Sequence, residues 1–391
     1  MWGSVTSLPS RLSITTVAGI CPRLRWEMGL ACSARLRRRL TQSCLECQPF
    51  PGLHQSETSL RSNKWMRLFP GSTMVADTVA HLLQAGPPGS SPWVLECNPG
   101  PGMITSALLN AGLQVIALEK DKTFLPYLES LKTHLSGQLE VIYCDFFNRD
   151  PPDNKVKTPP AMFTETLFRN FGIREIPWTA DVPVKIVGFF PAKNERNVLW
   201  KFLYDLYSRS SIYDYGRIEL NMFISEQEYK KIISKPGEKF YQPLSVLCQT
   251  AYEIKLLHKE PLSSFIIFKN GQFRSFKIME SKNNHLNFIQ LTPRRNLFTD
   301  NLTPMNSCNF MYLVKQCFAK RRYKLIDLFN SWYVHEKVDL LQKLSKNKHD
   351  LVASLGPEEF KYLFEVLESS ETFTQKWLFD HFLQNTVLES T

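Results

Sequence analysis

Short apolar runs alternate with amphipathic stretches between residues 63 and 293, which is the pattern of an α/β protein. Apolar runs of strand length occur at residues 93–97, 115–119, 139–145, 184–190, 216–224, 264–268 and 286–291. Helical spacing of apolar positions occurs at residues 73–83, 197–208 and 226–234. Strands that alternate with helices in this way predict a parallel, doubly wound sheet.

The strand pattern stops after residue 304, and amphipathic stretches follow at residues 310–318, 324–329, 334–344, 357–368 and 372–383. Pro357 suits the first position of a helix, because the N–H that proline lacks would be unpaired there. We therefore predict an α/β domain over residues 63–293 and a small all-helical domain over residues 294–391.

One of the predicted strands runs into a glycine turn and then a helix. Gly100 and Gly102 let the backbone turn sharply and lie against a ligand, whose polar groups can meet the free N–H groups of the helix. Two more strands end in acids: Glu119, which can accept both hydroxyls of a ribose, and Asp145, which precedes Phe146. Three polar strand ends at one sheet edge predict a cofactor crevice. The alternative is that the two acids only cap the following helices.

The glycine pattern decides between two classes of cofactor. A dinucleotide site needs a third glycine three residues after the second, and Thr105 stands there, which disfavours NAD. An acid before the glycines, Glu96, combined with the two acids at the later strand ends, is typical of S-adenosylmethionine-dependent methyltransferases. The proline-rich insert at residues 150–179 lacks periodicity, and we expect a long loop near this site that acts as a lid or a partner surface.

Charge is unevenly distributed along the chain. The net charge is +10, and residues 1–62 carry eight Arg against three acids, with Glu27 the only acid in the first 40 residues. This composition predicts a mitochondrial transit peptide and a disordered joint over residues 1–62, because the negative potential of the matrix attracts a basic amphipathic helix. A nucleic-acid-binding arm is the alternative.

Composition and cysteine spacing argue against a membrane protein, a disulfide-bonded protein and a zinc-binding protein. A hydrophobic content of 43% with 21% charged residues is typical of a globular protein, and no window reaches the ~18 to 20 apolar residues of a membrane span. The nine scattered cysteines indicate reduced thiols. Cys44 and Cys47 form a pair without a second pair at zinc spacing, so we expect no metal site.

The helical region contains a basic cluster next to aromatic residues. The cations are Lys315, Lys320, Arg321, Arg322 and Lys324, with no acid among them, and the aromatic residues are Phe318, Tyr323, Trp332 and Tyr333. Basic groups bind phosphates while aromatic faces stack on bases, so the cluster is a candidate single-strand binding surface. The alternative is a solvated basic helix with aromatic residues in the core.

The order of these motifs resembles the ribosomal RNA adenine dimethyltransferases. The resemblance rests on residues 96–102 (Glu-Cys-Asn-Pro-Gly-Pro-Gly), Leu-Glu at 118–119, Cys-Asp-Phe at 144–146, a fourth strand ending in proline, and the helix at 310–322. It covers about residues 63–391. It implies a doubly wound, Rossmann-like S-adenosylmethionine-dependent methyltransferase domain followed by a small all-helical domain, with S-adenosylmethionine as cofactor.

The resemblance also implies roles for individual residues. The backbone at Pro70 would contact the methionine moiety, Gly100 and Gly102 would approach the cofactor, Glu119 would hold the ribose, and Asp145 would accept from the adenine amino group. The full set expected to bind the cofactor is Pro70, Glu96, Asn98, Gly100, Gly102, Glu119, Asp145 and Phe146.

The fourth motif departs from the family. Members carry Asn-Leu-Pro-Tyr or a near variant, whose Asn side chain and Pro carbonyl accept hydrogen bonds from the target adenine; here the aligned residues are Phe189, Phe190, Pro191 and Ala192. Phenylalanine cannot accept such a bond, and losing one preorganised contact costs ~10²-fold or more in rate. Ala192 also removes the ring that stacks on a flipped base, for which Phe190 is a possible substitute, whereas the Pro191 carbonyl remains. No catalytic residue is therefore assigned.

Further strings at residues 177–181, 296–299 and 301–306, behind a basic leader, are similar to the mitochondrial transcription factor B branch of this family. That similarity implies a transcription initiation factor of the mitochondrial matrix and nucleoid. Its partners would be the single-subunit mitochondrial RNA polymerase and promoter DNA with mitochondrial transcription factor A. In this interpretation Lys320, Arg321 and Arg322 contact DNA. The alternative is an active N6,N6-adenine dimethyltransferase of mitochondrial small-subunit ribosomal RNA. We expect a monomer, because no heptad seam is visible.

Overall fold

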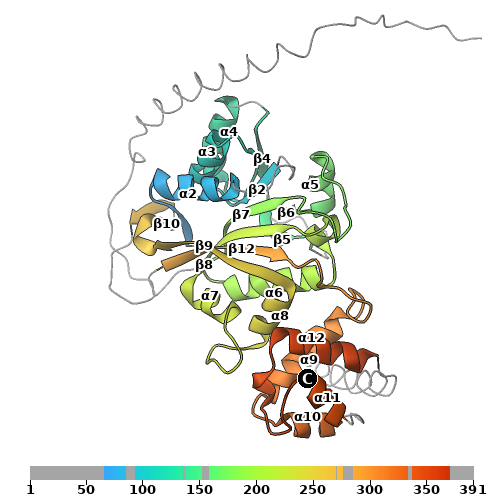
Figure 1. Ribbon diagram of the computed structural model, residues 1–391. Coiled ribbons are helices and arrows are strands. Elements are labelled where there is room, and N and C mark those ends of the chain that lie inside the picture. The colour runs from blue at the N-terminus through green and yellow to red at the C-terminus, as the bar shows by residue number, and fades with distance from the viewer. Residues whose placement is uncertain are drawn as a thin grey trace, which may run out of the picture. The chain divides into compact units, whose positions relative to one another are not determined.

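The computed structural model describes residues 66–84, 93–134, 137–151, 158–269, 271–275, 285–332 and 337–369 (Figure 1). All of these residues belong to one compact unit, Gly52–Thr391. The predicted leader, the Cys44 and Cys47 pair and the predicted helix at 372–383 lie outside the described residues.

A seven-stranded sheet has the order β4-β3-β2-β7-β8-β12-β9. Its strands are β2 (Trp93–Cys97), β3 (Gln114–Glu119), β4 (Leu139–Tyr143), β7 (Lys185–Phe189), β8 (Glu219–Ser225), β9 (Tyr252–Pro261) and β12 (His285–Pro293). The first five in this order are parallel, as predicted. The last two correct the prediction of a wholly parallel sheet, because β12 runs antiparallel to β8 and β9 antiparallel to β12. β9 was not predicted, since its largely exposed, charged residues form no apolar run.

Helices cover both faces of this sheet (Figure 1). α2 (Thr73–Gln84) and α3 (Met103–Asn110) pack with Val94 on one face, whereas α6 (Glu195–Tyr207) and α8 (Pro243–Ala251) pack in the core that contains Leu95. Neighbouring residues of a strand point to opposite faces, so one buried strand supplies both cores. The remaining helices of this region are η2 (Lys122–Phe124) with α4 (Leu125–His134), η3 (Ser211–Tyr215) and α7 (Glu226–Ile232).

A small antiparallel sheet has the order β1-β10-β11, with β1 at Arg67–Pro70, β10 at Phe265–Lys269 and β11 at Gln272–Ser275. η4 (Leu262–Ser264) leads into β10. The predicted strand at 264–268 therefore exists but belongs to this sheet and not to the parallel one. Its partner β1 comes from the beginning of the described chain, and Arg67 lies opposite Phe268.

The insert at residues 150–179 is not a loop throughout, which corrects the prediction. β5 (Asp145–Arg149) pairs with β6 (Ala161–Met162), and α5 (Thr164–Asn170) follows. α5 buries Leu167 and Phe168 in the main core. A helix of seven residues spans about two turns, which is too short to produce a recognisable period in the sequence.

The C-terminal region consists of α9 (Ser307–Ala319), α10 (Leu325–Ser331), α11 (Lys337–Lys343), η5 (Val352–Ser354) and α12 (Pro357–Glu368). The four predicted helices within the described residues are confirmed, with ends shifted by a few positions. Their core is continuous with that of the sheet: Phe310 contacts Tyr207 of α6 and Phe364 of α12. The domain boundary at residue 293 stays a prediction.

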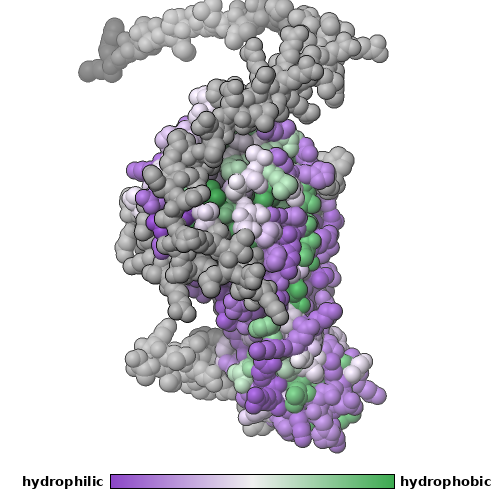
Figure 2. Space-filling model, turned by 90° about the vertical axis from the view of Figure 1, so that its left-hand side faces the viewer, coloured by the Kyte–Doolittle hydropathy of each residue, from purple (hydrophilic) through white to green (hydrophobic). Residues whose placement is uncertain are grey.

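The surface shown in Figure 2 is mostly hydrophilic where the chain is described, with hydrophobic side chains in small groups. Within the described ranges, no helix has both the length and the apolar character needed to cross a bilayer.

Candidate functional site

The glycine turn and the end of β3 meet at the carboxyl edge of the sheet, as predicted. The Gly100 N–H donates to Glu119 Oε2 at 2.8 Å, and the Asp121 N–H donates to Oε1 at 2.7 Å. Glu119 is fully buried. Its carboxylate therefore holds the turn after β2 and the turn after β3 together.

Arg67 of β1 makes a two-point ion pair with this carboxylate. Its Nη1 and Nη2 lie 2.8 Å from Glu119 Oε1 and Oε2, and Nη2 also donates to the Asn98 carbonyl at 3.0 Å. The guanidinium lies over the rings of Phe69 and Phe124, at 4.9 and 5.0 Å from their centroids. Sequence reasoning missed Arg67, because the four residues of β1 carry no periodic signal.

Phe69 covers the face of the glycine turn that was expected to meet a cofactor. Gly100 has φ +64°, and a Cβ built on it would lie 2.1 Å from Phe69 Cε1, so the position requires glycine. Gly102 packs instead against Leu131 and Leu128 of α4. The Pro70 backbone pairs with β10.

Glu96 lies beneath the crevice rather than in it. It is 1% exposed, and the Thr105 hydroxyl of α3 donates to its Oε2 at 2.6 Å. Burial, reinforced by the nearby Glu119 charge, raises the pKa of Glu96 to about 8, although the bond from Thr105 opposes the shift. At neutral pH Glu96 is therefore protonated and serves to anchor α3 to β2.

Asp145 is the crevice acid that stays partly accessible. Its side chain is 21% exposed, Lys120 Nζ lies 3.8 Å from Oδ2, and Oδ1 accepts the Phe147 N–H at 3.2 Å. Phe146 is fully buried and packs against Phe202 of α6. Phe146 thus belongs to the core and is not available to a ligand.

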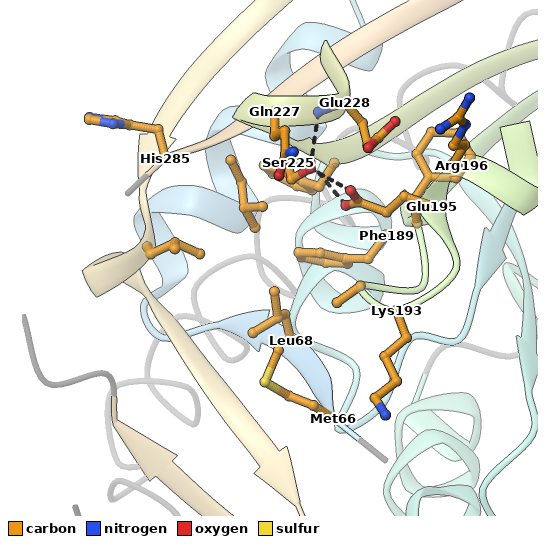
Figure 3. A pocket seen from close by; sticks show the side chains of 15 residues that line it. Met66, Leu68, Phe189, Lys193, Glu195, Arg196, Ser225, Gln227, Glu228 and His285 are labelled. Carbon is orange, nitrogen blue, oxygen red and sulfur yellow. Dashed lines mark hydrogen bonds between the residues drawn. The ribbon is translucent and has the colours of Figure 1, made fainter. Parts of the chain in front are cut away.

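Phe189, Phe190 and Ala192 of the altered fourth motif line a cavity of about 330 Å³ at the ends of β7 and β8 (Figure 3). Phe189 stacks on Phe223, with ring centroids 4.6 Å apart and planes at 17°. Phe190 is 4% exposed and packs against Phe202, so its ring is held in the core and is not free to stack on a base. Pro191 is half-buried and Ala192 exposed.

About half of the residues that line this cavity are apolar, among them Met66 just before β1, Leu68 of β1 and Leu286 of β12. The cations on its lining are Lys193 and Arg196. Apolar groups next to cations suit a planar base attached to a phosphate backbone, and the carboxyl groups of Glu195 and Glu228 line the same cavity.

Glu195 also lines the cavity and was missed by sequence reasoning. It accepts the Ser225 N–H at 3.0 Å and a hydrogen bond from the Ser225 hydroxyl (Figure 3). Burial raises the pKa of Glu195 to about 7, against the effect of these bonds. Its role in the structure is to fix the start of α6 to the end of β8.

A second, open hollow of about 540 Å³ lies between α6 and α9, lined by Asn197, Trp200, Lys201, Tyr204 and Lys315. Lys315 Nζ lies over both aromatic rings, 4.8 Å from the Trp200 centroid and 5.1 Å from the Tyr204 centroid. Tyr204 is 45% exposed. Burial lowers the pKa of Lys201, whose amino group donates to the Arg149 carbonyl at 2.8 Å.

The predicted DNA-binding cations lie in the turn after α9. Arg321 and Arg322 are exposed, and half-buried Lys320 lies over the ring of exposed Tyr323 at 5.7 Å. Phe318, in contrast, packs against Tyr241 and Phe360 in the core. The cluster thus divides into an exposed basic turn and a core aromatic, and Tyr333 lies outside the described residues.

Comparison with known proteins gives consistent results. The family described as "Ribosomal RNA adenine dimethylase" matches residues 72–369. Human "Dimethyladenosine transferase 2, mitochondrial" is 42% identical over 399 residues, covering 98% of this chain and 100% of the human protein. Human "Dimethyladenosine transferase 1, mitochondrial" is 28% identical over 176 residues, covering 44% of this chain and 46% of that protein. A solved dimethyladenosine transferase from Plasmodium falciparum is similar with a TM-score of 0.49 at 15% identity, covering 77% of this chain and 96% of the other.

Proposed function

Because the chain belongs to the ribosomal RNA adenine dimethylase family, and relatives along its whole length are mitochondrial, we propose that it serves in mitochondria as a transcription initiation factor built on a methyltransferase scaffold. In this proposal it helps the single-subunit mitochondrial RNA polymerase to melt promoters, alongside mitochondrial transcription factor A, and it holds separated DNA. It acts as a monomer in the matrix nucleoid.

The fourth motif is the observation that carries this proposal. Methyl transfer to N6 of adenine needs an acceptor that positions the amino group, and Phe189 offers a phenyl ring already stacked on Phe223. The cavity around it combines apolar side chains with the cations Lys193 and Arg196 and the acids Glu195 and Glu228. These features support retention of a base without the polar contacts that methylation requires.

The hollow between α6 and α9 extends the surface available to a single strand. Trp200 and Tyr204 supply aromatic rings for stacking, and Lys315 supplies a cation that lies over both rings. Lys315 and Lys320 are five residues apart along α9 and its end, which is about 7.5 Å of helical rise. A DNA single strand whose bases stack in the hollow therefore reaches the basic turn at Lys320–Arg322 within a few nucleotides.

The test is run-off transcription by the mitochondrial RNA polymerase on a duplex promoter, with the full chain added as wild type, as Glu119→Gln, and as the double variant Tyr204→Ala with Lys315→Ala. We expect wild type and Glu119→Gln to stimulate transcription equally. The double variant should stimulate about tenfold less, because one stacked base contributes roughly 1 to 3 kcal/mol. Glutamine replaces Glu119 because alanine would leave Arg67 without its partner.

The matched control is Tyr127→Ala with Lys255→Ala, an exposed aromatic and an exposed cation elsewhere on the unit. On a promoter whose start region is already melted by mismatches, transcription is expected to depend less on this protein. Absence of stimulation by wild type would reject the proposal and leave methylation as the main function.

Methylation is the second candidate, favoured by the retention of Glu119 at the end of β3 and Asp145 at the start of β5, just after β4. S-adenosylmethionine is the cofactor of this family. The candidate predicts transfer of labelled methyl groups to adenines of mitochondrial small-subunit ribosomal RNA, at a low rate because of Phe189.

The described crevice fits this cofactor only in part. Asn98 Oδ1 is buried and makes no hydrogen bond within the described structure, so a ligand N–H is a suitable donor for it. Glu119, however, is fully engaged by protein donors. In this arrangement the crevice does not accept the ribose.

A further inference from the structure

We propose that Arg67 competes with the cofactor for Glu119, so that β1 acts as an internal occupant of the ribose position and sets the affinity for S-adenosylmethionine. The proposal concerns cofactor binding alone. It holds whether the chain acts mainly in transcription or in methylation.

The hydrogen-bond capacity of Glu119 is the first argument. A carboxylate has about four acceptor positions. Oε1 accepts from Arg67 Nη1 at 2.8 Å and from the Asp121 N–H at 2.7 Å, and Oε2 accepts from Arg67 Nη2 and the Gly100 N–H, both at 2.8 Å. The two backbone donors belong to the turns that shape the crevice. The two positions that a ribose diol would use are those that the guanidinium takes.

The strand pairing of β1 is the second argument, because it fixes which side chains face the crevice. Arg67 and Phe69 share one face of β1, where they contact Phe124 and the glycine turn. Leu68 on the other face, together with Met66 just before β1, lines the cavity beside Phe189 (Figure 3). Pairing of β1 with β10 in this register places the guanidinium at Glu119.

The environment of the guanidinium is the third argument. Arg67 is 16% exposed, lies over two aromatic rings and makes a third hydrogen bond to the Asn98 carbonyl. A bidentate, charge-assisted pair in such surroundings is stronger than an exposed one. The ribose can bind only when the Arg67–Glu119 pair is open. The apparent affinity is therefore the intrinsic affinity multiplied by the fraction of time that the pair is open. A pair closed about 90% of the time or more weakens binding about tenfold or more.

The main test is calorimetric titration of S-adenosylhomocysteine into the full chain as wild type, Arg67→Gln and Arg67→Lys. We expect Arg67→Gln to bind at least about tenfold more tightly than wild type, and Arg67→Lys to lie between them, because lysine keeps the charge without the fork. Arg169→Gln is the matched control, because it breaks the exposed Arg169–Glu165 pair and is expected to leave affinity unchanged.

Thermal melts establish that each variant is folded, and Arg67→Lys decides the question if Arg67→Gln does not fold. Equal or weaker binding by a folded Arg67 variant overturns the proposal.

A second measurement uses wild type alone: modification of Arg67 by phenylglyoxal, followed by mass spectrometry, is expected to rise at saturating S-adenosylhomocysteine. Continued protection of Arg67 in the bound state would show that cofactor and guanidinium do not compete. Run-off transcription enters neither measurement, so the two proposals fail independently.

Discussion

Glu96 shows how burial changes the chemistry of a single residue. Its carboxyl has a pKa raised to about 8 in the folded chain, mainly by burial, whereas an exposed Glu in the unfolded chain has 4.5. Between these two values the folded state binds more protons than the unfolded state. The contribution of Glu96 to stability is therefore fully present below pH 4.5 and is lost progressively as the pH rises towards 8.

We expect Glu96→Gln to remove this loss, because glutamine is neutral at every pH and still accepts the bond from Thr105. Relative to wild type, the variant should gain little near pH 5 and roughly 3 to 5 kcal/mol by pH 8, at about 1.4 kcal/mol per pH unit. Urea unfolding at pH 5, 6.5 and 8 measures the difference. A gain of equal size at all three values would contradict the assignment.

Glu195 is a second buried carboxyl group with which Glu96 can be compared. Burial raises the pKa of Glu195 to about 7, whereas that of Glu96 is about 8. For Glu195→Gln the gain is expected to stop growing near pH 7, whereas for Glu96→Gln it continues for a further unit. The two pH windows separate the two carboxyls in one set of measurements.

At the scale of secondary-structure elements, Arg217 joins two segments of the chain through hydrogen bonds. It is 5% exposed and donates to the carbonyls of Trp178 at 3.0 Å, Ala180 at 2.6 Å and Pro293 at 3.0 Å. These carbonyls lie in the segment before β7 and at the end of β12. One guanidinium therefore ties the predicted insert to the end of β12 in the main sheet.

We expect Arg217→Ala to lower the free energy of unfolding by about 3 kcal/mol, because it leaves buried carbonyls without donors. Arg217→Lys should recover only part of the loss, since an ammonium cannot form the fork. Arg295→Ala is the control: its partner Asp181 is 90% exposed, and such surface pairs contribute about 0 to 1 kcal/mol. Urea unfolding followed by tryptophan fluorescence measures all three, and equal losses for Arg217→Ala and Arg295→Ala would reject this role.

Local patterns and non-local pairings account for what the sequence predicted and what it missed. The glycine turn and the end of β3 at Glu119 were predictable, because each signal lies within about ten residues; the strand predicted to end at Asp145 ends at Tyr143, and Asp145 begins β5. β1 was not, because it has four residues and its partner strand begins almost 200 positions later. The state of the crevice depends on that pairing, which brings Arg67 to Glu119. The sequence predicts the glycine turn and the acids of the crevice, and the tertiary structure determines which of these residues remain free to bind a ligand.

For the whole molecule, the placement of charge matters more than its sum. Half of the net charge of +10 belongs to residues 1–62, and residues 294–391 are almost neutral in total. Within them, Lys320, Arg321 and Arg322 stand together without an acid. Affinity for a single strand is expected to depend on this segregated turn for phosphate contacts, and on the hollow between α6 and α9 for stacking.

Salt titration separates the two contributions. Replacing Lys320, Arg321 and Arg322 by Ala is expected to weaken binding of a labelled single-stranded DNA and to reduce the slope of log K against log salt by about 2, at roughly 0.7 per lost phosphate contact. Lys230→Ala with Lys255→Ala and Lys343→Ala removes the same charge from side chains paired with acids, and should change the slope less. Trp200→Ala should weaken binding with an unchanged slope, because stacking releases no counterions. Anisotropy over a sodium chloride series measures these slopes, and an unaltered slope in the triple variant at 320–322 would exclude that turn from phosphate binding.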